Sequence, residues 1–400
     1  MVNDISVILG DPHIGRSTGL GRVGIGSGLN SRIIDQINIL DFTLDNAIKV
    51  GATYIIITGD IFEDPRPHPT FITLFMNWLH KCVDSNIVVH ILMGNHDLLR
   101  SGQFNISALD IISSAGLENV YVHKTITTIH TNGASYTIVP FRDRRSFNTD
   151  SNADALNILG KKIDYEVIEV ENNQYKVVIG HLAIENSIMV GDEIDDMVNE
   201  LFCPVSMFNG YDYGFFGHIH KPQILSVSPY IAHIGSMDLS DFGETDHTKI
   251  LAVFDPSKSQ PLKYIDIPTR PLKQISVSVP ENIINSTEYV VKELENNEVL
   301  KNAIVKLNIH LNNSNTVSID RTEVEGVINK LGAFHIARIS EERKSTTIKT
   351  NQTQDIDNTV NELTAIKMYA SSNIEKEYQN DFISLASSIV NECKSEKVIS

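Results

Sequence analysis

The stretch VVHILMGNHD, residues 88–97, joins an apolar run to an amide, an imidazole and a carboxylate. Four other short apolar runs, at 5–9, 54–57, 175–179 and 213–216, also lead into residues that can bind a metal. These residues are Asp11-Pro12-His13, Gly59-Asp60, Gly180-His181 and Gly217-His218-Ile219-His220. Strands that point the same way in one sheet end along one edge, and ligands of open α/β sheets bind there. The pattern therefore predicts that these side chains, far apart in sequence, meet at one rim.

Length and composition limit the class of protein. The chain has 400 residues, and 42% of them are hydrophobic, which predicts two or three domains with real cores. Its three cysteines, Cys82, Cys203 and Cys393, are far apart, and no CxxC occurs, which favours a reducing compartment without a disulfide framework. No signal peptide and no apolar run of about 18 residues is seen, so we expect a soluble cytoplasmic protein without a membrane segment.

The net charge of −17 bears on possible partners. A protein that binds nucleic acid alone over a long footprint is usually basic. The acidity therefore argues against such a footprint, although it leaves room for a local basic strip beside a metal site. It also favours a partner that supplies part of any DNA affinity.

The pattern along the chain predicts three regions. Residues 1–267 alternate strands with helices at 31–50 and 70–82, and short strands dominate from about 120 onward. This favours an α/β fold with two packed sheets, a β-sandwich flanked by helices. The segment IPTRPL at 267–272 marks a boundary, and 268–350 then reads as a small α/β capping domain. Residues 351–400 form a polar linker and C-terminal helices with an apolar stripe.

The metal-binding motifs differ in specificity when each is taken alone. Asp-x-His occurs often by chance, and Gly59-Asp60 is ordinary turn chemistry. Residues 94–97 are more specific, because four residues are fixed and a strand precedes them. Two imidazoles at 218 and 220 lie on one side of an extended segment. All of them together, each after a strand, predict a metal centre.

The order of these motifs resembles the signature of calcineurin-like metallophosphoesterases. That signature runs Asp-x-His, Gly-Asp, Gly-Asn-His-Asp, a later His and Gly-His-x-His. Finer features are similar to the SbcD family of DNA double-strand-break repair nuclease subunits. They are Gly59-Asp60-Ile61-Phe62 before a Pro-rich step, residues 217–223, Ile234-Gly235-Ser236 with the trailing 241–244, and Arg270-Pro271-Leu272. The resemblance is strong over the phosphoesterase region and rests on layout elsewhere. A source in bacteria or viruses fits it.

The resemblance also implies the ligands. One metal would be held by Asp11, His13, Asp60 and His220, and the other by Asp60, Asn95, His181 and His218. Mixed oxygen and imidazole ligands suit manganese or iron, and we expect two divalent ions, Mn²⁺ above Mg²⁺. Ions about 3.5–4 Å apart would activate a bridging water and clamp an in-line displacement. His96 resembles the general acid, with Asp97 orienting its ring; the alternative for Asp97 is a helix N-cap.

Other residues are candidates for DNA contacts and for a dimer. Arg142, Arg144 and Arg145 can contact phosphates, with a solvated surface loop as the alternative. Arg16, Arg22 and Arg32 lie in or beside the glycine-rich segment 19–28. They too can either contact phosphates or belong to a solvated surface loop. The apolar stripe Phe71, Leu74, Phe75 and Trp78 fits either a buried helix or a homodimer interface, and the resemblance favours the dimer.

The sequence as a whole predicts a two-metal phosphodiesterase that acts on DNA. The resemblance implies a 3′→5′ exonuclease with endonuclease activity on single strands or hairpins. Its partner would be an SbcC-type ATPase, whose coiled coil the C-terminal helices bind; no GxxxxGK[ST] loop occurs in this chain. The alternatives are a small-substrate phosphatase or cyclic-nucleotide phosphodiesterase, and a scaffold with a degenerate site.

Overall fold

The structure is a computed structural model. It describes residues 4–17, 19–24, 26, 28–98, 107–168, 174–189, 200–297, 299–312, 315, 317–343, 370, 378–380, 382–386 and 388. Contacts divide the chain into two units, Met1–Lys344 and Ser345–Ser400. Within these described ranges, no helix is both long enough and apolar enough to cross a membrane.

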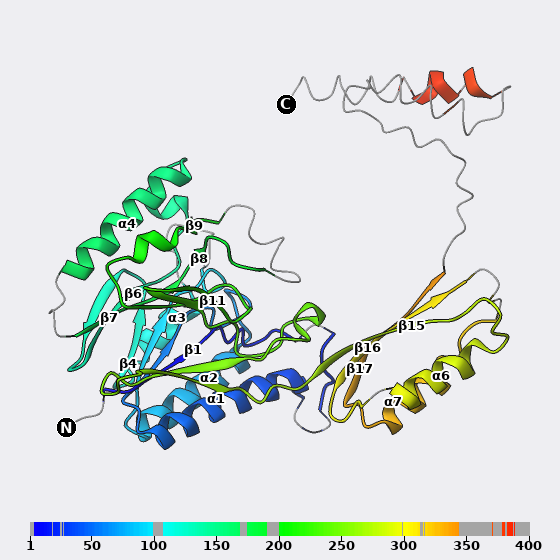
Figure 1. The fold of residues 1–400 in the computed structure, drawn as a ribbon, viewed down its shortest axis with the longest axis horizontal. Coiled ribbons are helices and arrows are strands. Elements are labelled where there is room, and N and C mark those ends of the chain that lie inside the picture. Colours follow the sequence, from blue (N-terminus) through cyan, green and yellow to red (C-terminus); the bar gives the residue numbers. More distant parts are fainter. Residues whose placement is uncertain are drawn as a thin grey trace. The chain divides into compact units, whose positions relative to one another are not determined.

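Two six-stranded sheets form the body of the first unit (Figure 1). The first sheet has the order β14 (Leu262–Asp266), β13 (Ile250–Phe254), β1 (Ser6–Leu9), β2 (Tyr54–Ile57), β3 (Val88–Leu92) and β4 (Val120–His123). The second has the order β11 (Gln223–Val227), β12 (Tyr230–His233), β10 (Tyr213–Gly217), β7 (Tyr175–His181), β6 (Ala134–Val139) and β5 (Thr127–His130). β1 to β4 are parallel, as are β6, β7, β10 and β12, so the strands of each set end along one edge.

The two sheets pack face to face through one apolar core. Ile8 and Ile56 of the first sheet belong to the same buried cluster as Ile179 and Phe215 of the second. Parallel strands that are covered on both faces read as continuous apolar runs rather than alternating ones. This is why the sequence shows the metal-bearing strands as short uninterrupted hydrophobic stretches.

Helices cover the outer faces of both sheets. α1 (Ser31–Val50), α2 (Pro69–Asp84) and α3 (Ala108–Ser114) pack on the first sheet, and α4 (Asn152–Ile168) with the short η2 (Val205–Phe208) packs on the second. Figure 1 shows α1 and α2 on one side of the body and α4 on the opposite side. The remaining short elements are η1 (Arg144–Phe147), η3 (Phe242–Glu244), β8 (Ala183–Ile184) and β9 (Phe202–Cys203).

Local sequence signals explain where the first two helices begin and end. The Asn30 side chain accepts a hydrogen bond from the Arg32 amide at the start of α1, and Gly51 closes that helix with φ +71°. Pro69 is the first residue of α2, where its missing N–H is not needed. The expected helices at 31–50 and 70–82 are therefore confirmed.

The prediction that short strands dominate after residue 120 overlooked α4. Its buried side chains are Ala155, Leu159 and Ile163, spaced four apart. Such a narrow stripe surrounded by polar residues is a weak helical signal.

The predicted dimer stripe is wrong for two of its four residues. Phe75 is 0% exposed and Trp78 is 1% exposed within this single chain. The Trp78 indole donates a hydrogen bond to the Leu40 carbonyl at 2.8 Å and stacks on Phe75. Side chains that are already buried in their own core have no surface to offer a second copy. Of the stripe, Phe71 and Leu74 remain half-buried.

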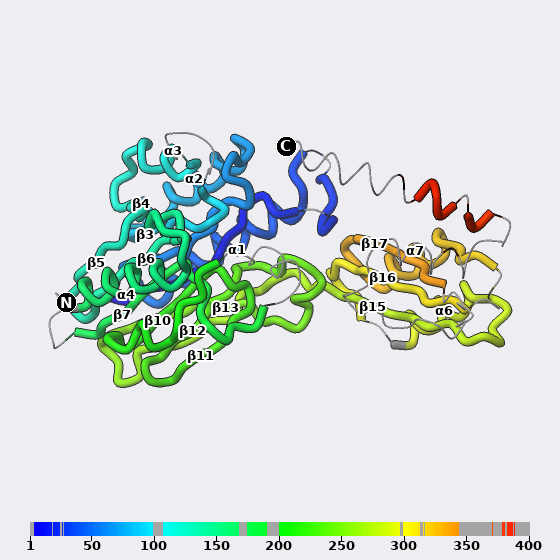
Figure 2. Tube along the Cα trace, turned by 90° about the horizontal axis from the view of Figure 1, so that it is seen from above, coloured from blue at the N-terminus to red at the C-terminus, as the bar shows by residue number. Residues whose placement is uncertain are grey.

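Residues 272–343 form a small α/β lobe with a core of their own (Figure 2). It consists of the parallel strands β15 (Leu272–Ser278), β16 (Ile304–Leu311) and β17 (His335–Arg343), and the helices α6 (Ser286–Asn297) and α7 (Arg321–Lys330). Val305, Leu307 and Ile309 of β16 join Val290 and Val324 of the helices in this core. The helices therefore cover one face of the lobe's sheet.

A joint of charged and apolar side chains attaches the lobe to the body. Arg270 binds both carboxylate oxygens of Asp35 on α1, at 2.6 and 2.8 Å. The Arg270 guanidinium also lies 3.7 Å from the centroid of the Phe334 ring, and that of Arg22 lies 4.3 Å from it. A small apolar cluster of Leu20, Leu239, Leu272 and Ile304 completes the contact.

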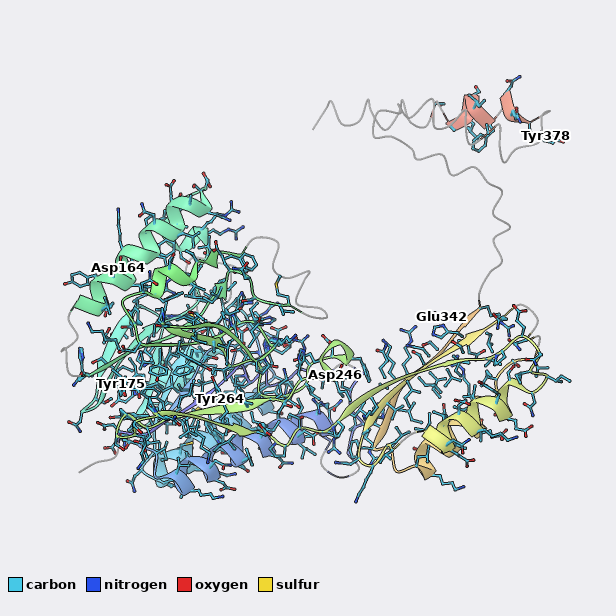
Figure 3. The ribbon with its side chains drawn as sticks, in the orientation of Figure 1. Asp164, Tyr175, Asp246, Tyr264, Glu342 and Tyr378 are labelled. Carbon is cyan, nitrogen blue, oxygen red and sulfur yellow. The ribbon has the colours of Figure 1, made fainter. Side chains whose placement is uncertain are left out.

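The predicted C-terminal stripe lies largely outside the described residues. Within the second unit, the Phe382 amide donates a hydrogen bond to the Tyr378 carbonyl, and the Tyr378 and Leu385 side chains are exposed. Tyr378 is labelled in Figure 3. The prediction of partner-binding helices at 351–400 is not tested by these few residues.

Candidate metal centre

The predicted ligands meet at the rim where β1, β2, β3, β7 and β10 end. All but one of them are buried. The exposed fractions are Asp11 0%, His13 3%, Asp60 2%, His181 0%, His218 5% and His220 5%, and Asn95 is half-buried. Several buried charged or polar side chains in one place require either mutual pairing or a bound cation.

The backbone at this rim is strained and tightly packed. Three predicted ligands that are not glycine have positive φ values: His13 at 43°, Asp60 at 48° and His218 at 82°. Such conformations cost of order 1–3 kcal/mol each and concentrate at functional sites. A Cβ added to Gly94 would lie 2.0 Å from an Asp60 carboxylate oxygen, and this close approach requires the glycine.

Asp11, His13 and His220 form one cluster of possible ligand atoms with their donor atoms within 4.8 Å of one another. The Nε2 atoms of His13 and His220 lie 3.0 Å apart, and Asp60 Oδ2 lies 3.6 Å from His13 Nε2. The ring nitrogens therefore face a common point. Asp11 is held there by the Thr58 hydroxyl and the His218 amide, which donate to its two oxygens.

Asp60, His181 and His218 form a second cluster. His181 Nε2 and His218 Nδ1 lie 2.8 and 2.9 Å from Asn95 Oδ1, and His181 Nε2 lies 3.2 Å from Asp60 Oδ2. The amide oxygen and the two ring nitrogens thus converge on one point beside Asp60. Asp60 borders both clusters, as the predicted bridging carboxylate must.

The charges of these residues fit two divalent cations. No Lys or Arg among the described residues lies within ion-pair distance of Asp11 or Asp60, although both are buried. Burial lowers the pKa of His181, but Asp60 and Asp11 outweigh it and raise that pKa to about 9. Burial lowers the pKa of His220 to about 3, which favours the neutral imidazole that binds a metal. The raised pKa of His181 reflects the two buried carboxylates beside it, whose charge a bound cation would also offset. The donor set of carboxylates, an amide and imidazoles suits manganese, iron or zinc without thiolates.

A buried Lys–Glu pair lies behind the first cluster. Glu244 ends the quoted motif 241–244, which gave it no role, and no motif indicated Lys249. Glu244 Oε1 lies 3.3 Å from His220 Nδ1, and its other oxygen lies 2.8 Å from the Lys249 ammonium. Lys249 also donates to the His220 carbonyl and the Ser236 hydroxyl, at 2.8 and 2.7 Å. Burial would raise the pKa of Glu244, but His220 and Lys249 hold it well below its usual range. Partners of this kind fix the tautomer and the orientation of a ligating imidazole.

Glu63 has a similar position next to His13. Its Oε2 lies 2.9 Å from His13 Nδ1, and its Oε1 lies 3.9 Å from Arg16 Nε. Its backbone carbonyl lies 2.8 Å from His96 Nδ1. One residue therefore positions both a predicted ligand and the predicted acid. Glu63 directly follows the Gly59–Phe62 motif, which is the one sequence signal that could have singled it out.

The structure corrects the role expected for Asp97. Its oxygens accept hydrogen bonds from the backbone amides of Ile61 and Gly94, at 3.1 and 2.9 Å. Within the described residues it neither bonds the His96 ring nor caps a helix. Burial and the nearby Asp60 raise the pKa of Asp97 to about 7. Asp97 therefore ties the two loops of the rim together, and the Glu63 carbonyl orients His96.

The predicted phosphate-binding arginines differ in availability. Arg142 donates to the carbonyls of Phe141 and Lys124, and its burial lowers its pKa. Arg32 is 1% exposed and paired with Asp238 at 2.6 Å. The prediction for Arg32 is wrong, because a phosphate could not reach its guanidinium without breaking that buried pair. Arg142 is half-buried with two of its N–H groups engaged, and its contact with phosphate stays a prediction.

The other arginines remain candidates for phosphate contacts. Arg144 and Arg145 lie in η1, and one Arg144 nitrogen bonds the Asp150 carbonyl. Arg16 is half-buried beside the metal ligands, and Arg22 stacks on Phe334. Nothing in the structure tests whether they contact DNA.

Comparison with known proteins agrees with this geometry. A family profile described as calcineurin-like phosphoesterase matches residues 6–222, more than half of the chain. The chain is 24% identical over 264 residues to the SbcD component of the nuclease SbcCD from Staphylococcus epidermidis, covering 63% of this chain and 69% of that protein. It is 24% identical over 269 residues to the same component from Escherichia coli K12, covering 60% and 65%.

A dimetal phosphatase of Danio rerio is similar in structure, with a TM-score of 0.41 and 11% identity, covering 66% of this chain and 98% of that one. The family match spans the strands and loops that carry every residue of both clusters. The chain therefore belongs to the calcineurin-like phosphoesterase family, whose members hydrolyse phosphoesters with divalent metal ions.

Proposed function

We propose that this protein is a metal-dependent DNA nuclease that works as a subunit of an SbcCD-type repair or recombination complex. The observation that supports it best is the convergence of the predicted ligands into two adjacent clusters, with Asp60 in the second cluster and its carboxylate 3.6 Å from His13 of the first. The similarity to two SbcD proteins supports DNA as the substrate, because it extends beyond the family profile.

The proposed metals are two Mn²⁺ ions. Asp11, His13, Asp60 and His220 would hold one, and Asp60, Asn95, His181 and His218 would hold the other. When bound, such a pair supplies an activated water and charge stabilisation for displacement at phosphorus. The chain itself sets the donors in place through the strained loops, the Lys249–Glu244 pair and Glu63.

His96 is the proposed proton donor to the leaving oxygen. Its Nδ1 faces the Glu63 carbonyl at 2.8 Å, so Nε2 is the nitrogen left to act. The His96 ring lies 4.8 Å from that of His13, at the border of the first cluster. A histidine fixed at one nitrogen presents its other nitrogen to substrate in one orientation, which general acid catalysis needs.

The finer activities follow the same proposal. We propose 3′→5′ exonuclease action and endonuclease action on single strands or hairpins. Residues 268–350 would act as a capping domain that contacts DNA, with Arg16, Arg144 and Arg145 as further phosphate contacts. We also propose a homodimer and an SbcC-type ATPase bound by residues 351–400; Phe71 and Leu74 remain available to a dimer.

End-labelled DNA tests this proposal. Duplex, hairpin and single-stranded substrates are incubated with Mn²⁺ or Mg²⁺, with and without a candidate ATPase and ATP. We expect Mn²⁺-dependent shortening from the 3′ end, stimulated by the ATPase. Turnover of a small phosphodiester such as bis(p-nitrophenyl) phosphate, without cleavage of any DNA, would instead support a small-substrate phosphodiesterase.

A further inference from the structure

A pocket of about 480 Å³ lies next to the metal centre, between the body and the small lobe. Four parts of the chain line it: Arg16 and Leu20 after β1, Glu63 after β2, Phe242 in η3, and Lys306 and Arg338 in the lobe. In Figure 3, Asp246, in the loop that follows η3, lies between the body and the lobe. The volume falls in the range of sites that hold one small ligand, roughly 300–1,000 Å³.

The pocket adjoins the metal centre through shared lining residues. Glu63 lines it and lies 2.9 Å from His13, a predicted ligand. Arg16 also lines the narrow hollow that contains Asp11 and His13. A chain of nucleotides with one phosphate at the metals would therefore place a neighbouring nucleotide at this pocket.

No helix of the described residues covers the sheet face that forms one wall. Parallel sheets are normally covered on both faces. In the lobe, α6 and α7 cover one face only. Lys306 and Arg338 are register neighbours on β16 and β17, and they lie on the opposite face from the core residues Val305 and Leu307. This open face is polar, which suits a polar ligand better than an apolar partner.

The charge of the pocket suits phosphate. Arg16, Lys306 and Arg338 contribute three cations in a chain of net charge −17. Neither Lys306 nor Arg338 has a carboxylate within ion-pair distance in the described part of the chain. Of the two acidic residues that line the pocket, Glu63 is paired with His13 and with Arg16, and Asp241 accepts a hydrogen bond from the Gly243 amide. Lys306 and Arg338 are therefore the two cations left for a phosphate.

An aromatic ring completes the pocket. Phe242 is half-buried in η3, and the Lys306 ammonium lies 5.6 Å from its ring centroid. Proteins that hold single-stranded nucleic acid combine a cationic groove with aromatic rings on which bases stack. Duplex DNA, whose bases are paired and stacked, cannot present a base to such a ring.

We propose that this pocket binds one unstacked nucleotide of the strand being cut, with its phosphate near Arg338 and Lys306 and its base against Phe242. This inference rests on the proposed nuclease function. It adds that the substrate held next to the metals is a single strand, so a duplex end must be opened by at least one nucleotide before cleavage.

Substitutions in the lobe test the pocket. Arg338→Ala and Lys306→Ala are compared with Lys273→Ala, which removes an exposed lysine of β15 outside the pocket. The substrates are a labelled oligothymidylate and bis(p-nitrophenyl) phosphate, both with Mn²⁺. For the oligonucleotide, we expect each pocket variant to raise KM and to lower the salt dependence of binding by about 0.7 in log–log slope. We expect Lys273→Ala to match the wild type.

The base contact has its own test. Phe242→Leu should weaken oligonucleotide binding roughly 5- to 100-fold. An abasic site at one position of the strand should weaken binding to the wild type but not further weaken binding to Phe242→Leu. If removing the base at each position in turn never weakens binding to the wild type more than to Phe242→Leu, no base stacks on Phe242.

The outcomes separate the two proposals. If the wild type hydrolyses the small diester and no DNA, the proposed nuclease function fails. If it cleaves DNA but both pocket variants behave like Lys273→Ala, only the pocket inference fails. Equal loss of small-diester turnover in the pocket variants would also overturn the inference, because the residues would then act through the metal centre. If the pocket variants weaken binding of a blunt duplex as much as binding of a single strand, the pocket contacts duplex DNA and the inference is wrong.

Discussion

Replacing Glu244 with Gln tests whether an outer carboxylate sets the metal affinity of the first cluster. Gln has the same shape, so the packing around η3 is kept while the negative charge between His220 and Lys249 is lost. Losing such an outer partner typically weakens metal binding 10- to 100-fold. At about 1.4 kcal/mol per tenfold change, this is roughly 1.4–2.8 kcal/mol of binding free energy.

The same change has a separate effect on stability. Lys249 is 0% exposed and would keep its charge without a counterion. Removing one partner of a buried ion pair costs about 3–5 kcal/mol, whereas replacing both partners with uncharged groups is often close to neutral. We therefore expect Glu244→Gln to lower the free energy of unfolding, and the double variant with Lys249→Met to recover part of the loss. Metal affinity should stay low in both variants.

Manganese titration followed by electron paramagnetic resonance measures the free ion directly and reports both affinity and stoichiometry. Asp246→Asn is the matched control, because it removes an equal charge from an exposed position two residues away. In Glu244→Gln, we expect weaker binding of one of the two Mn²⁺ ions. In the control, we expect both ions to bind as in the wild type. Wild-type affinity for both ions in Glu244→Gln would refute the assigned role.

Three further changes test other parts of the structure. Asp60→Ala should remove bound Mn²⁺ and activity together, since Asp60 borders both clusters; metal analysis that still finds two ions per chain would contradict its bridging position. His96→Asn should leave both ions bound while cleavage falls roughly 10²- to 10⁴-fold, and a lost ion would make His96 a ligand. Burial lowers the pKa values of His90 and His123 to about 3 and about 4, below the ordinary 6.5, so both must take up protons on unfolding as the pH falls. The two histidines contribute fully to the free energy of unfolding above about pH 6.5, and this contribution is lost toward pH 4. Chemical denaturation at pH 7.5 and 5 should therefore show a smaller loss of unfolding free energy in His90→Phe than in the wild type. An equal loss in the two proteins would refute this.

The strand ends were predictable because they depend on local signals. An apolar run buried on both faces, followed by Gly and a ligand residue, identifies both a strand and its carboxyl end. Topology does the rest, since parallel strands bring Asp11, Asp60 and Asn95 to one rim. The order of the motifs was therefore enough to predict most residues of the candidate metal centre.

The supporting residues were not predictable, because their partners come from elsewhere in the fold. Glu244 ends η3 and Lys249 immediately precedes β13, and only the return of that segment to His220 gives them a role. Asp97 is next to His96 in sequence, yet its carboxylate faces the amides of another loop. Trp78 looked like an interface residue because a helical stripe does not reveal which surface covers it.

The contact at Arg270, which attaches the lobe to the body, is open to competition from other anions. The Arg270 and Asp35 side chains are only 15% and 11% exposed, so dissolved salt screens their pair weakly. A second anion with two oxygens in the geometry of a carboxylate is a direct competitor for the same guanidinium, and a phosphodiester has that geometry. A polyanion should therefore break the Arg270–Asp35 pair at ionic strengths at which simple salt does not.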